Sequence, residues 1–296
     1  MPQSVVDLHM HSSASYDGEY SPKQLMQLCR NAGLRAAALA DHNSTTGVQE
    51  AVIWGGEYGV EVIPAIELDC LFQGRQLHML GYFINHNDSV FIKIQNDVLR
   101  VERRAVEERI AKIESLGLYV NRRKLMEMSP NGTVNSPMIL KAMLDEPANA
   151  DSRLLAPYRP GGARGDEPFF NFYRDICAPG MPAHAAIAYM PAEEAVSLIK
   201  SQGGVPVLAH PGHNIGEDME ILEGIIALGV WGIEAYSNYH TLEQTLLFER
   251  EAKKRGILAA CGSDFHGQIK PNIQLGSCCC HGREQEILSE LKALRG

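Results

Sequence analysis

The stretch VDLHMHSSASYDGEY (residues 6–20) begins with a β-strand pattern that carries histidines. Apolar side chains at positions 6, 8 and 10 alternate with Asp7, His9 and His11, which is the two-residue period of a strand with one apolar face and one polar face. A buried imidazole needs hydrogen-bond partners or a metal ion. The pattern therefore predicts a core strand whose polar face meets one of these two needs.

The composition is that of an ordinary globular protein. The chain has 296 residues, 45% hydrophobic and 21% charged, and a formal net charge of −9. That size suits one large α/β domain with an insertion, or two domains. An acidic chain does not fit a non-specific nucleic-acid binder, which needs a basic surface. We find no membrane-spanning stretch and no secretion signal at the start, and we expect a cytoplasmic protein.

Cysteine usage gives no disulfide framework, since the seven cysteines show no regular spacing. The run Cys278-Cys279-Cys280 could suggest a metal cluster. Three adjacent residues on a strand point to alternating faces, however, and would chelate one ion poorly. We therefore expect small buried thiols in a late strand.

Strand and helix patterns alternate along most of the chain. Ser21 and Pro22 mark the first helix start, as an N-cap and a first helical residue. We count seven strands, mostly joined by helices, which predicts a parallel sheet, open or closed into a barrel. The strand patterns cover residues 5–11, 34–42, 60–70, 75–83, 205–210, 231–237 and 257–266.

The middle of the chain breaks this alternation. Residues 88–116 form one long amphipathic helix pattern, Asn121 starts a shorter helix, and Ser136 with Pro137 starts another. A long loop rich in Pro, Gly and charge follows, and loops of that length are usually functional or disordered. We expect a first barrel part at 1–96, an inserted helical cap at 97–182 and a second barrel part at 183–296.

Candidate metal ligands lie at or near the ends of the predicted strands, where parallel α/β barrels hold their active sites. A single histidine there is more often only hydrogen-bonded, but the joint pattern is stronger. Nine ligands are too many for one ion and suit two or three divalent metals sharing a carboxylate, with Mn most favoured and Fe or Zn as alternatives. The candidates are His9, His11, Asp17, His42, Glu67, His78, His210, Asp264 and His266.

The motifs DLHMHSSASYDG, LADHNSTTG, IELDC, HMLGYF, LAHPG and GSDFH, in this order, resemble those of the PHP family, named for polymerase and histidinol phosphatase. The resemblance covers about two-thirds of the chain. It implies a distorted seven-stranded (β/α) barrel and metal-dependent phosphoester hydrolysis by a metal-activated water. It also implies three ligand sets. They are His9, His11, Glu67 and Asp264; Glu67, His78 and His210; and Asp17, His42 and His266.

The long insertion resembles the family members that act on nucleotides, which include 3',5'-nucleoside bisphosphate phosphatases and 5'-to-3' exoribonucleases. A guanidinium is a natural phosphate partner and a helix start is a natural anion site. An aromatic ring could stack on a base. We expect substrate contacts from Ser12, Ser13, Arg103, Arg104, Asn135, Ser136 and Phe170, and we consider His240 as a catalytic residue.

These inferences predict a phosphatase of small nucleotides that releases the 3'-phosphate of a nucleoside 3',5'-bisphosphate such as adenosine 3',5'-bisphosphate. Two alternatives remain, an exonuclease acting on short 5'-phosphorylated oligonucleotides and a histidinol-phosphate-type phosphatase. A metal-bearing barrel that only binds or regulates is a further possibility, but the full ligand set argues against it. The sequence gives no sign of a membrane or a stable protein partner.

Overall fold

A computed structural model describes residues 4–129 and 132–295. The chain divides into two compact units, and the first is assembled from both ends of the sequence. It consists of Met1–Gln95 together with Tyr189–Gly296, while Asn96–Ala188 form the second. The substrate-binding role expected for the inserted segment stays a prediction.

The first unit is built on one sheet whose strands follow the order β1-β2-β3-β4-β6-β7-β8, with β5 paired to β3 outside this path. The seven-stranded α/β barrel expected from the sequence is confirmed. The strands are β1 (Val6–Met10), β2 (Ala36–Leu39), β3 (Glu61–Phe72), β4 (Arg75–Tyr82), β5 (Met190–Pro191), β6 (Val205–Leu208), β7 (Gly232–Ser237) and β8 (Leu258–Gly262).

The sheet curls until its first and last strands meet. Met10 and Phe265 form an isolated parallel bridge, and the His11 amide donates to the Phe265 carbonyl at 2.9 Å. The Asp264 amide donates to the His9 carbonyl at 2.8 Å. These bonds bring the His-rich end of β1 next to the segment that follows β8.

The prediction of a parallel sheet is wrong at β4, which runs antiparallel to both β3 and β6. The cause is the connection between β3 and β4. Only Gln73 and Gly74 separate them, and both have positive φ, at 49° and 78°. A two-residue turn of this kind makes a hairpin, whereas a parallel crossover needs a dozen residues or more.

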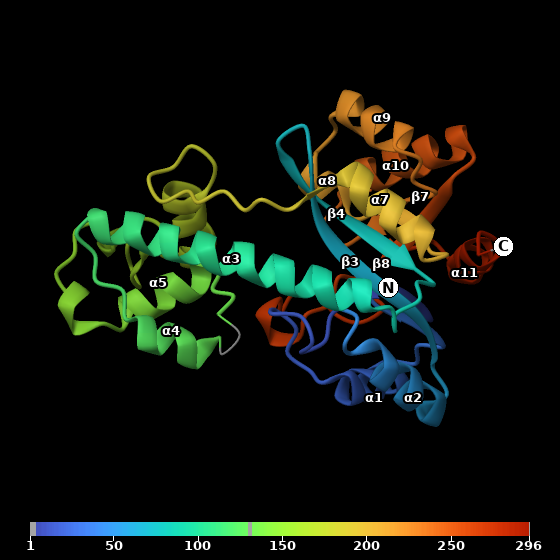
Figure 1. Cartoon of the computed structure of the whole chain (residues 1–296), viewed down its shortest axis with the longest axis horizontal. Coiled ribbons are helices and arrows are strands. Elements are labelled where there is room, and N and C mark those ends of the chain that lie inside the picture. Colours follow the sequence, from blue (N-terminus) through green and yellow to red (C-terminus); the bar gives the residue numbers. More distant parts are fainter. Residues whose placement is uncertain (1–3, 130–131, 296) are drawn as a thin grey trace. The chain divides into compact units, whose positions relative to one another are not determined.

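Helices pack against this sheet, and their starts follow local capping chemistry. Ser21 and Gln24 form a capping box at α1, and Thr241 and Gln244 form one at α10. Helices α1 and α2 lie side by side (Figure 1). The helices are α1 (Pro22–Asn31), α2 (Val48–Tyr58), α7 (Ala192–Ser201), α8 (Pro211–Asn214), α9 (Met219–Ala227), α10 (Leu242–Arg255) and α11 (Glu284–Ala293), with the short 3₁₀ turn η4 (Gly267–Ile269).

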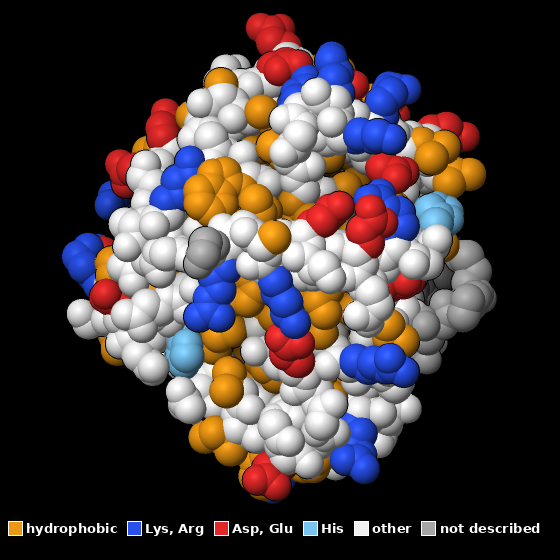
Figure 2. Space-filling model, turned by 90° about the vertical axis from the view of Figure 1, so that its right-hand side faces the viewer, with side chains coloured by type: hydrophobic (Ala, Val, Ile, Leu, Met, Phe, Trp, Pro, Cys, Tyr) orange, Lys and Arg blue, Asp and Glu red, His pale blue; other side chains and the backbone are white. Residues whose placement is uncertain are grey.

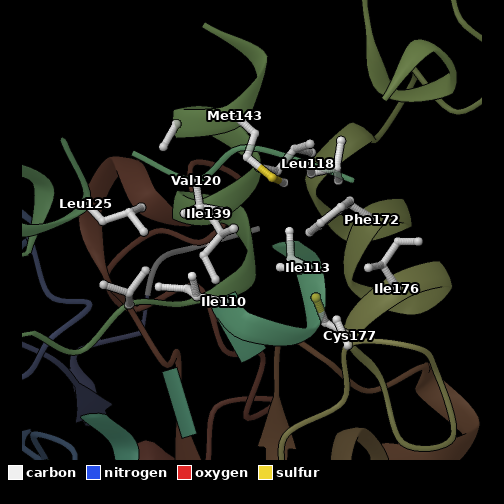
Figure 3. Packing of buried hydrophobic residues seen from close by; sticks show 14 of the residues in the cluster. Ile110, Ile113, Leu118, Val120, Leu125, Ile139, Met143, Phe172, Ile176 and Cys177 are labelled. Carbon is white, nitrogen blue, oxygen red and sulfur yellow. The ribbon is translucent and has the colours of Figure 1, made fainter. Parts of the chain in front are cut away.

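The second unit is helical and has a core of its own. Side chains of α3, including Ile110 and Ile113, meet Ile139, Met143 and Phe172 from other helices (Figure 3). Its core lies beyond residue 105, although α3 begins in the first unit. The helical segments are α3 (Ser89–Ser115), α4 (Arg122–Met128), α5 (Ser136–Leu144), η1 (Pro147–Asn149), η2 (Ala156–Tyr158), α6 (Pro168–Phe172) and the π-helical η3 (Tyr173–Cys177).

Two local predictions need correction. The N-cap of α5 is Asn135, whose side chain accepts from the Met138 amide at 2.9 Å, and Ser136 is the first helical residue. The expected late strand at residues 278–280 is wrong, because this segment is a loop. Cys278 and Cys280 are nevertheless buried, as expected.

The surface and the helices agree with the composition. Within the described ranges, no helix is both long and apolar enough to cross a membrane. On the face shown in Figure 2, acidic and basic side chains are interspersed, and no broad field of one sign appears. A wide basic surface for nucleic-acid backbones is not seen on this face.

Candidate metal-centred active site

The barrel brings all nine predicted ligands together within the first unit. Each belongs to at least one group of side chains whose ligand atoms lie within 4.8 Å of one another. His78 joins them although it lies early in β4, because β4 is antiparallel and begins where β3 ends. The reversed strand therefore explains a ligand inside a strand instead of at its end.

The first group contains His9, His11, Glu67 and Asp264, all buried. His9 Nε2 lies 3.2 Å from Glu67 Oε2 and 3.3 Å from Asp264 Oδ1. His11 Nε2 lies 3.2 Å and 2.9 Å from the same two oxygens. Two imidazoles and two carboxylates thus converge on one point.

Glu67 links this group to a second one. Its other oxygen, Oε1, lies 3.0 Å from His78 Nδ1 and 3.1 Å from His210 Nε2. The two oxygens of one carboxylate therefore face two different pairs of imidazoles. This is the geometry of a carboxylate that can bridge two ions.

A third group contains Asp17, His42 and His266 together with His11, which also belongs to the first group. Asp17 Oδ2 lies 3.1 Å from His266 Nε2 and 3.7 Å from His42 Nε2. The other ring nitrogen of His42 lies 3.2 Å from Glu67 Oε2. His42 is thus placed between the third group and the first.

Two observations indicate that these residues can hold divalent ions. Ligand atoms about 2.1 Å from an ion lie roughly 3.0–3.5 Å apart at tetrahedral or octahedral angles, which is the spacing found in the first two groups. In addition, several buried atoms of these groups make no hydrogen bond within the described part of the chain, a costly state without a cation. They are Asp17 Oδ1, His42 Nδ1, Glu67 Oε2, His78 Nδ1, Asp264 Oδ1 and His266 Nε2.

The electrostatics keep the carboxylates ionised. Burial opposes the charge, but His9, His42 and His78 hold the pKa of Glu67 well below its usual range. Burial likewise opposes ionisation of Asp264, and His266 and Lys270 overcome it and lower its pKa. Burial lowers the pKa of His42 to about 4, so that its imidazole is neutral and able to ligate at neutral pH.

The backbone is strained just after the strands that lead to the ligands. Asn43, His210 and Asp264 adopt positive φ values of 53°, 21° and 58°. Such conformations cost about 1–3 kcal/mol each for non-glycine residues and persist where the surroundings enforce them. All three residues follow the ends of strands at the cluster. At such sites a strained backbone orients functional side chains.

Sequence reasoning missed a buried carboxylate that supports two ligands. Glu234 Oε1 lies 3.0 Å from His9 Nδ1, and Glu234 Oε2 accepts from the His210 amide at 2.9 Å. Gly262 makes room for this contact, because a Cβ there would lie 2.2 Å from the His9 Cβ and 2.4 Å from Glu234 Oε1. The signal was an acid in the apolar strand GIEAYS, since buried acids are rare without a partner.

Asp69 was also missed as a site residue. Its Oδ1 lies 3.1 Å from His78 Nε2, and its Oδ2 accepts from the Asn43 side-chain amide at 2.5 Å. Asn43 in turn accepts from the Asp69 amide at 3.0 Å. This exchange of hydrogen bonds fixes the carboxylate that faces His78.

A lysine and a tyrosine complete the surroundings of Asp264. Lys270 Nζ lies 2.8 Å from Asp264 Oδ2 and donates to the Tyr239 hydroxyl at 2.7 Å. The Tyr239 hydroxyl donates to the same carboxylate oxygen at 2.5 Å. Burial and the neighbouring Asp264 raise the pKa of Tyr239, so that it remains a donor.

Of three predicted site residues in the first unit, His240 and Ser12 bind other groups and Ser13 is exposed. Both ring nitrogens of His240 are engaged, Nε2 by the Gly212 amide at 3.0 Å and Nδ1 by the Ala235 carbonyl at 2.9 Å, and this favours a structural role over a catalytic one. The Ser12 hydroxyl donates to Asp41 at 2.7 Å. Ser13 is exposed.

The remaining predicted substrate residues lie in the second unit. Arg103, Arg104 and Phe170 are exposed, and the ring of Phe170 has the Arg174 guanidinium 5.7 Å away. Asn135 caps α5, and Ser136 is buried with a hydrogen bond to Cys177. No metal-cluster residue belongs to this unit in the described part of the chain.

Comparison with known proteins agrees with this site. Residues 7–140 match the family profile of the PHP domain. The chain is 26% identical over 270 residues to a phosphoribosyl 1,2-cyclic phosphate 1,2-diphosphodiesterase of Eggerthella lenta, covering 90% of this chain and 95% of that protein. It is 24% identical to a 3',5'-nucleoside bisphosphate phosphatase of Chromobacterium violaceum, covering 88% and 87%. It is 27% identical to a 5'-3' exoribonuclease of Haemophilus influenzae, covering 88% and 89%.

Two solved structures share the fold. One is described as an amidohydrolase from Chromobacterium violaceum, with a TM-score of 0.76, 22% identity and 97% coverage of both chains. The other is described as a metal-dependent phosphoesterase from Bifidobacterium adolescentis, with a TM-score of 0.76, 23% identity and 96% coverage of both chains. The chain therefore contains a PHP domain, on a barrel of the PHP type. The PHP domain, the relatives and the histidine–carboxylate cluster together identify the chain as a metal-dependent phosphoesterase.

Proposed function

We propose that this protein is a phosphatase of small nucleotides, and that it releases the 3'-phosphate of nucleoside 3',5'-bisphosphates such as adenosine 3',5'-bisphosphate. The observation that carries the hydrolytic part is the position of Glu67 between two pairs of imidazoles. The nucleotide substrate is supported by the Chromobacterium violaceum relative, which is a 3',5'-nucleoside bisphosphate phosphatase.

The proposed ligands of the first ion are His9, His11, Glu67 and Asp264, and those of the second are Glu67, His78 and His210. Asp17, His42 and His266 would hold a third. Manganese is the metal we favour, because imidazole and carboxylate together suit Mn, Fe or Zn better than Mg or Ca. When bound, such ions lower the pKa of a water molecule and neutralise charge on a phosphoryl oxygen.

The chain's own residues orient these groups and bring in a positive charge. Glu234 holds the His9 ring and the backbone at His210, and Asn43 holds Asp69. We propose that Lys270, one-third exposed beside Asp264, contacts a phosphoryl oxygen of the substrate. Tyr239 and Lys270 both bind one oxygen of Asp264 and leave Oδ1 to face the histidines.

A 5'-to-3' exonuclease is the second candidate, favoured by the exoribonuclease relative from Haemophilus influenzae. In either case, we propose that Arg103, Arg104, Asn135, Ser136 and Phe170 contact the part of the substrate that does not react. This part of the proposal rests on residue chemistry and on the resemblance to nucleotide-acting members.

A substrate panel distinguishes these activities. Metal-free protein is reloaded with Mn²⁺ and given adenosine 3',5'-bisphosphate, a 5'-phosphorylated oligoribonucleotide and a cyclic phosphate ester of ribose. We expect inorganic phosphate from the bisphosphate as the fastest reaction. Faster release of mononucleotides from the oligoribonucleotide would replace the proposal by the exonuclease, and fastest opening of the cyclic ester would replace it by a diesterase of the Eggerthella lenta type.

A further inference from the structure

Three cysteines form a second cluster of ligand atoms, separate in composition from the histidine–carboxylate site. The Sγ atoms of Cys261, Cys278 and Cys280 lie within 4.8 Å of one another, and all three side chains are buried. Cys261 lies near the end of β8, and the other two come from the loop before α11. Cys261 therefore meets two cysteines that lie 17 and 19 positions further along the chain.

The loop directs alternate side chains inward. Cys279, between the two buried cysteines, is only partly buried, and its Sγ lies 3.7 Å from His281 Nδ1. The three consecutive cysteines thus do not form one set of ligand atoms by themselves. Two of them are combined with a third from a neighbouring strand, an arrangement that only the folded chain produces.

The loop is fixed on both sides of the cluster. The Gly276 amide donates to the buried carboxylate of Asp7 at 2.8 Å, and Ser277 accepts from the Asn238 side chain at 2.8 Å. On the other side, Arg283 donates to the Tyr236 hydroxyl at 2.9 Å and to Glu249 at 2.8 Å. The sulfur atoms are therefore held together by contacts that do not depend on the sulfurs themselves, as a preorganised ligand set requires.

The spacing suits a soft metal ion. With a metal–sulfur distance of about 2.3 Å, two sulfur ligands at tetrahedral or trigonal angles lie roughly 3.8–4.0 Å apart. The Sγ atoms of Cys278 and Cys280 are 4.0 Å apart. Thiolates select Zn²⁺ and similar thiophilic ions over Mg²⁺, Ca²⁺ or Mn²⁺.

We propose that Cys261, Cys278 and Cys280 form a thiolate site for one Zn²⁺ or a similar thiophilic divalent ion, distinct from the proposed catalytic metals. Binding forms three metal–sulfur bonds, and each thiol that becomes a thiolate ligand releases its proton to solvent. Within the described ranges, the group of ligand atoms consists of these three sulfurs. The ion ties the loop before α11 to β8, the strand that leads to Asp264 and His266.

Cadmium is the probe, because its bonds to sulfur absorb in the ultraviolet, whereas its bonds to nitrogen and oxygen do not. Reduced, metal-free full-length protein is titrated with Cd²⁺. We expect one equivalent to give the sulfur-to-metal band, and Zn²⁺ to remove it by competition. Cys280→Ser should lose the band, and Cys279→Ser, the matched control next to it, should keep it.

Cadmium NMR of the wild-type protein gives a readout that needs no variant, since a sulfur-bound cadmium resonates apart from nitrogen- and oxygen-bound ones. This measurement therefore tests sulfur ligation even if Cys280→Ser does not fold. Circular dichroism shows whether the variant folds. Only nitrogen- and oxygen-bound cadmium, equal loss of the band in both variants, or a disulfide among the three cysteines in the freshly purified protein would overturn the proposal.

Discussion

His9 Nδ1 and Glu234 Oε1 lie 3.0 Å apart, and both side chains are completely buried. His9 belongs to β1 and Glu234 to β7. The contact favours the tautomer of His9 that carries its proton on Nδ1. With the proton on Nδ1 and donated to Glu234, the lone pair of Nε2 points at Glu67 and Asp264. Outer carboxylates of this kind orient metal-binding imidazoles and raise their basicity.

Glu234→Gln should weaken metal binding and lower activity by about 10- to 100-fold, the usual effect of losing such a partner. The amide keeps the shape but removes the charge that stabilises the Nδ1 proton. Metal affinity by isothermal titration and kcat/KM at saturating metal are the measurements. Glu243→Gln, an exposed acid at the start of α10, is the control. Unchanged affinity in Glu234→Gln would show that the contact is only structural.

Glu67→Ala should remove nearly all hydrolysis and reduce the metal content while the barrel still folds. The reason is that its two oxygens face both proposed ions, so one substitution damages two sites at once. Elemental analysis of the purified variant measures its metal content, and circular dichroism shows whether the barrel folds. Glu61→Ala is the matched control on the same strand, since Glu61 is half exposed and paired only with Lys292 among the ion pairs described. A full metal content with full activity would refute the ligand assignment.

His42→Ala should abolish a weaker class of metal binding and leave a tighter one. The group of Asp17, His42 and His266 has looser spacing than the first two groups, with 3.7 Å between Asp17 Oδ2 and His42 Nε2. Titration of metal into metal-free protein resolves the classes. His86→Ala serves as control, because His86 lies outside the cluster and contacts Gln49. One uniform class of sites, the same in both variants, would contradict a separate third site.

Arg104→Ala should impair hydrolysis of a nucleoside 3',5'-bisphosphate and spare a 3'-monophosphate. Losing one charge-assisted hydrogen bond to the non-reacting phosphate costs roughly 1.5–3 kcal/mol, or about 10- to 100-fold in kcat/KM. The monophosphate lacks that group, so the variant has no contact to lose.

Steady-state kinetics on the two substrates tests this selectivity. Arg100→Ala is the control on the same helix, as Arg100 is exposed and already paired with Asp97 at 2.6 Å. Equal losses on both substrates would place Arg104 at the reacting phosphate or in support of the fold. No loss on either would leave it as part of a solvated helix face.

The sequence by itself determined the features that depend on near neighbours. Capping residues such as Ser21 and Thr241 begin helices because they satisfy amides three positions away. The period of two in residues 6–11 places His9 and His11 on one face of a strand. Recurrence of His, Asp and Glu at strand ends then indicated one shared site, since the ends of barrel strands meet.

Only the tertiary structure decided which distant groups pair. The direction of β4 depends on a two-residue turn, and it places His78 at the same end as Glu67. Glu234 becomes a partner of His9 only because the curled sheet brings β7 and β1 to the same interior, 225 positions apart in sequence. Cys261 meets Cys278 and Cys280 for the same reason. Local propensity acts over a few residues, whereas these contacts depend on how the strands and the loops after them are placed in the folded barrel.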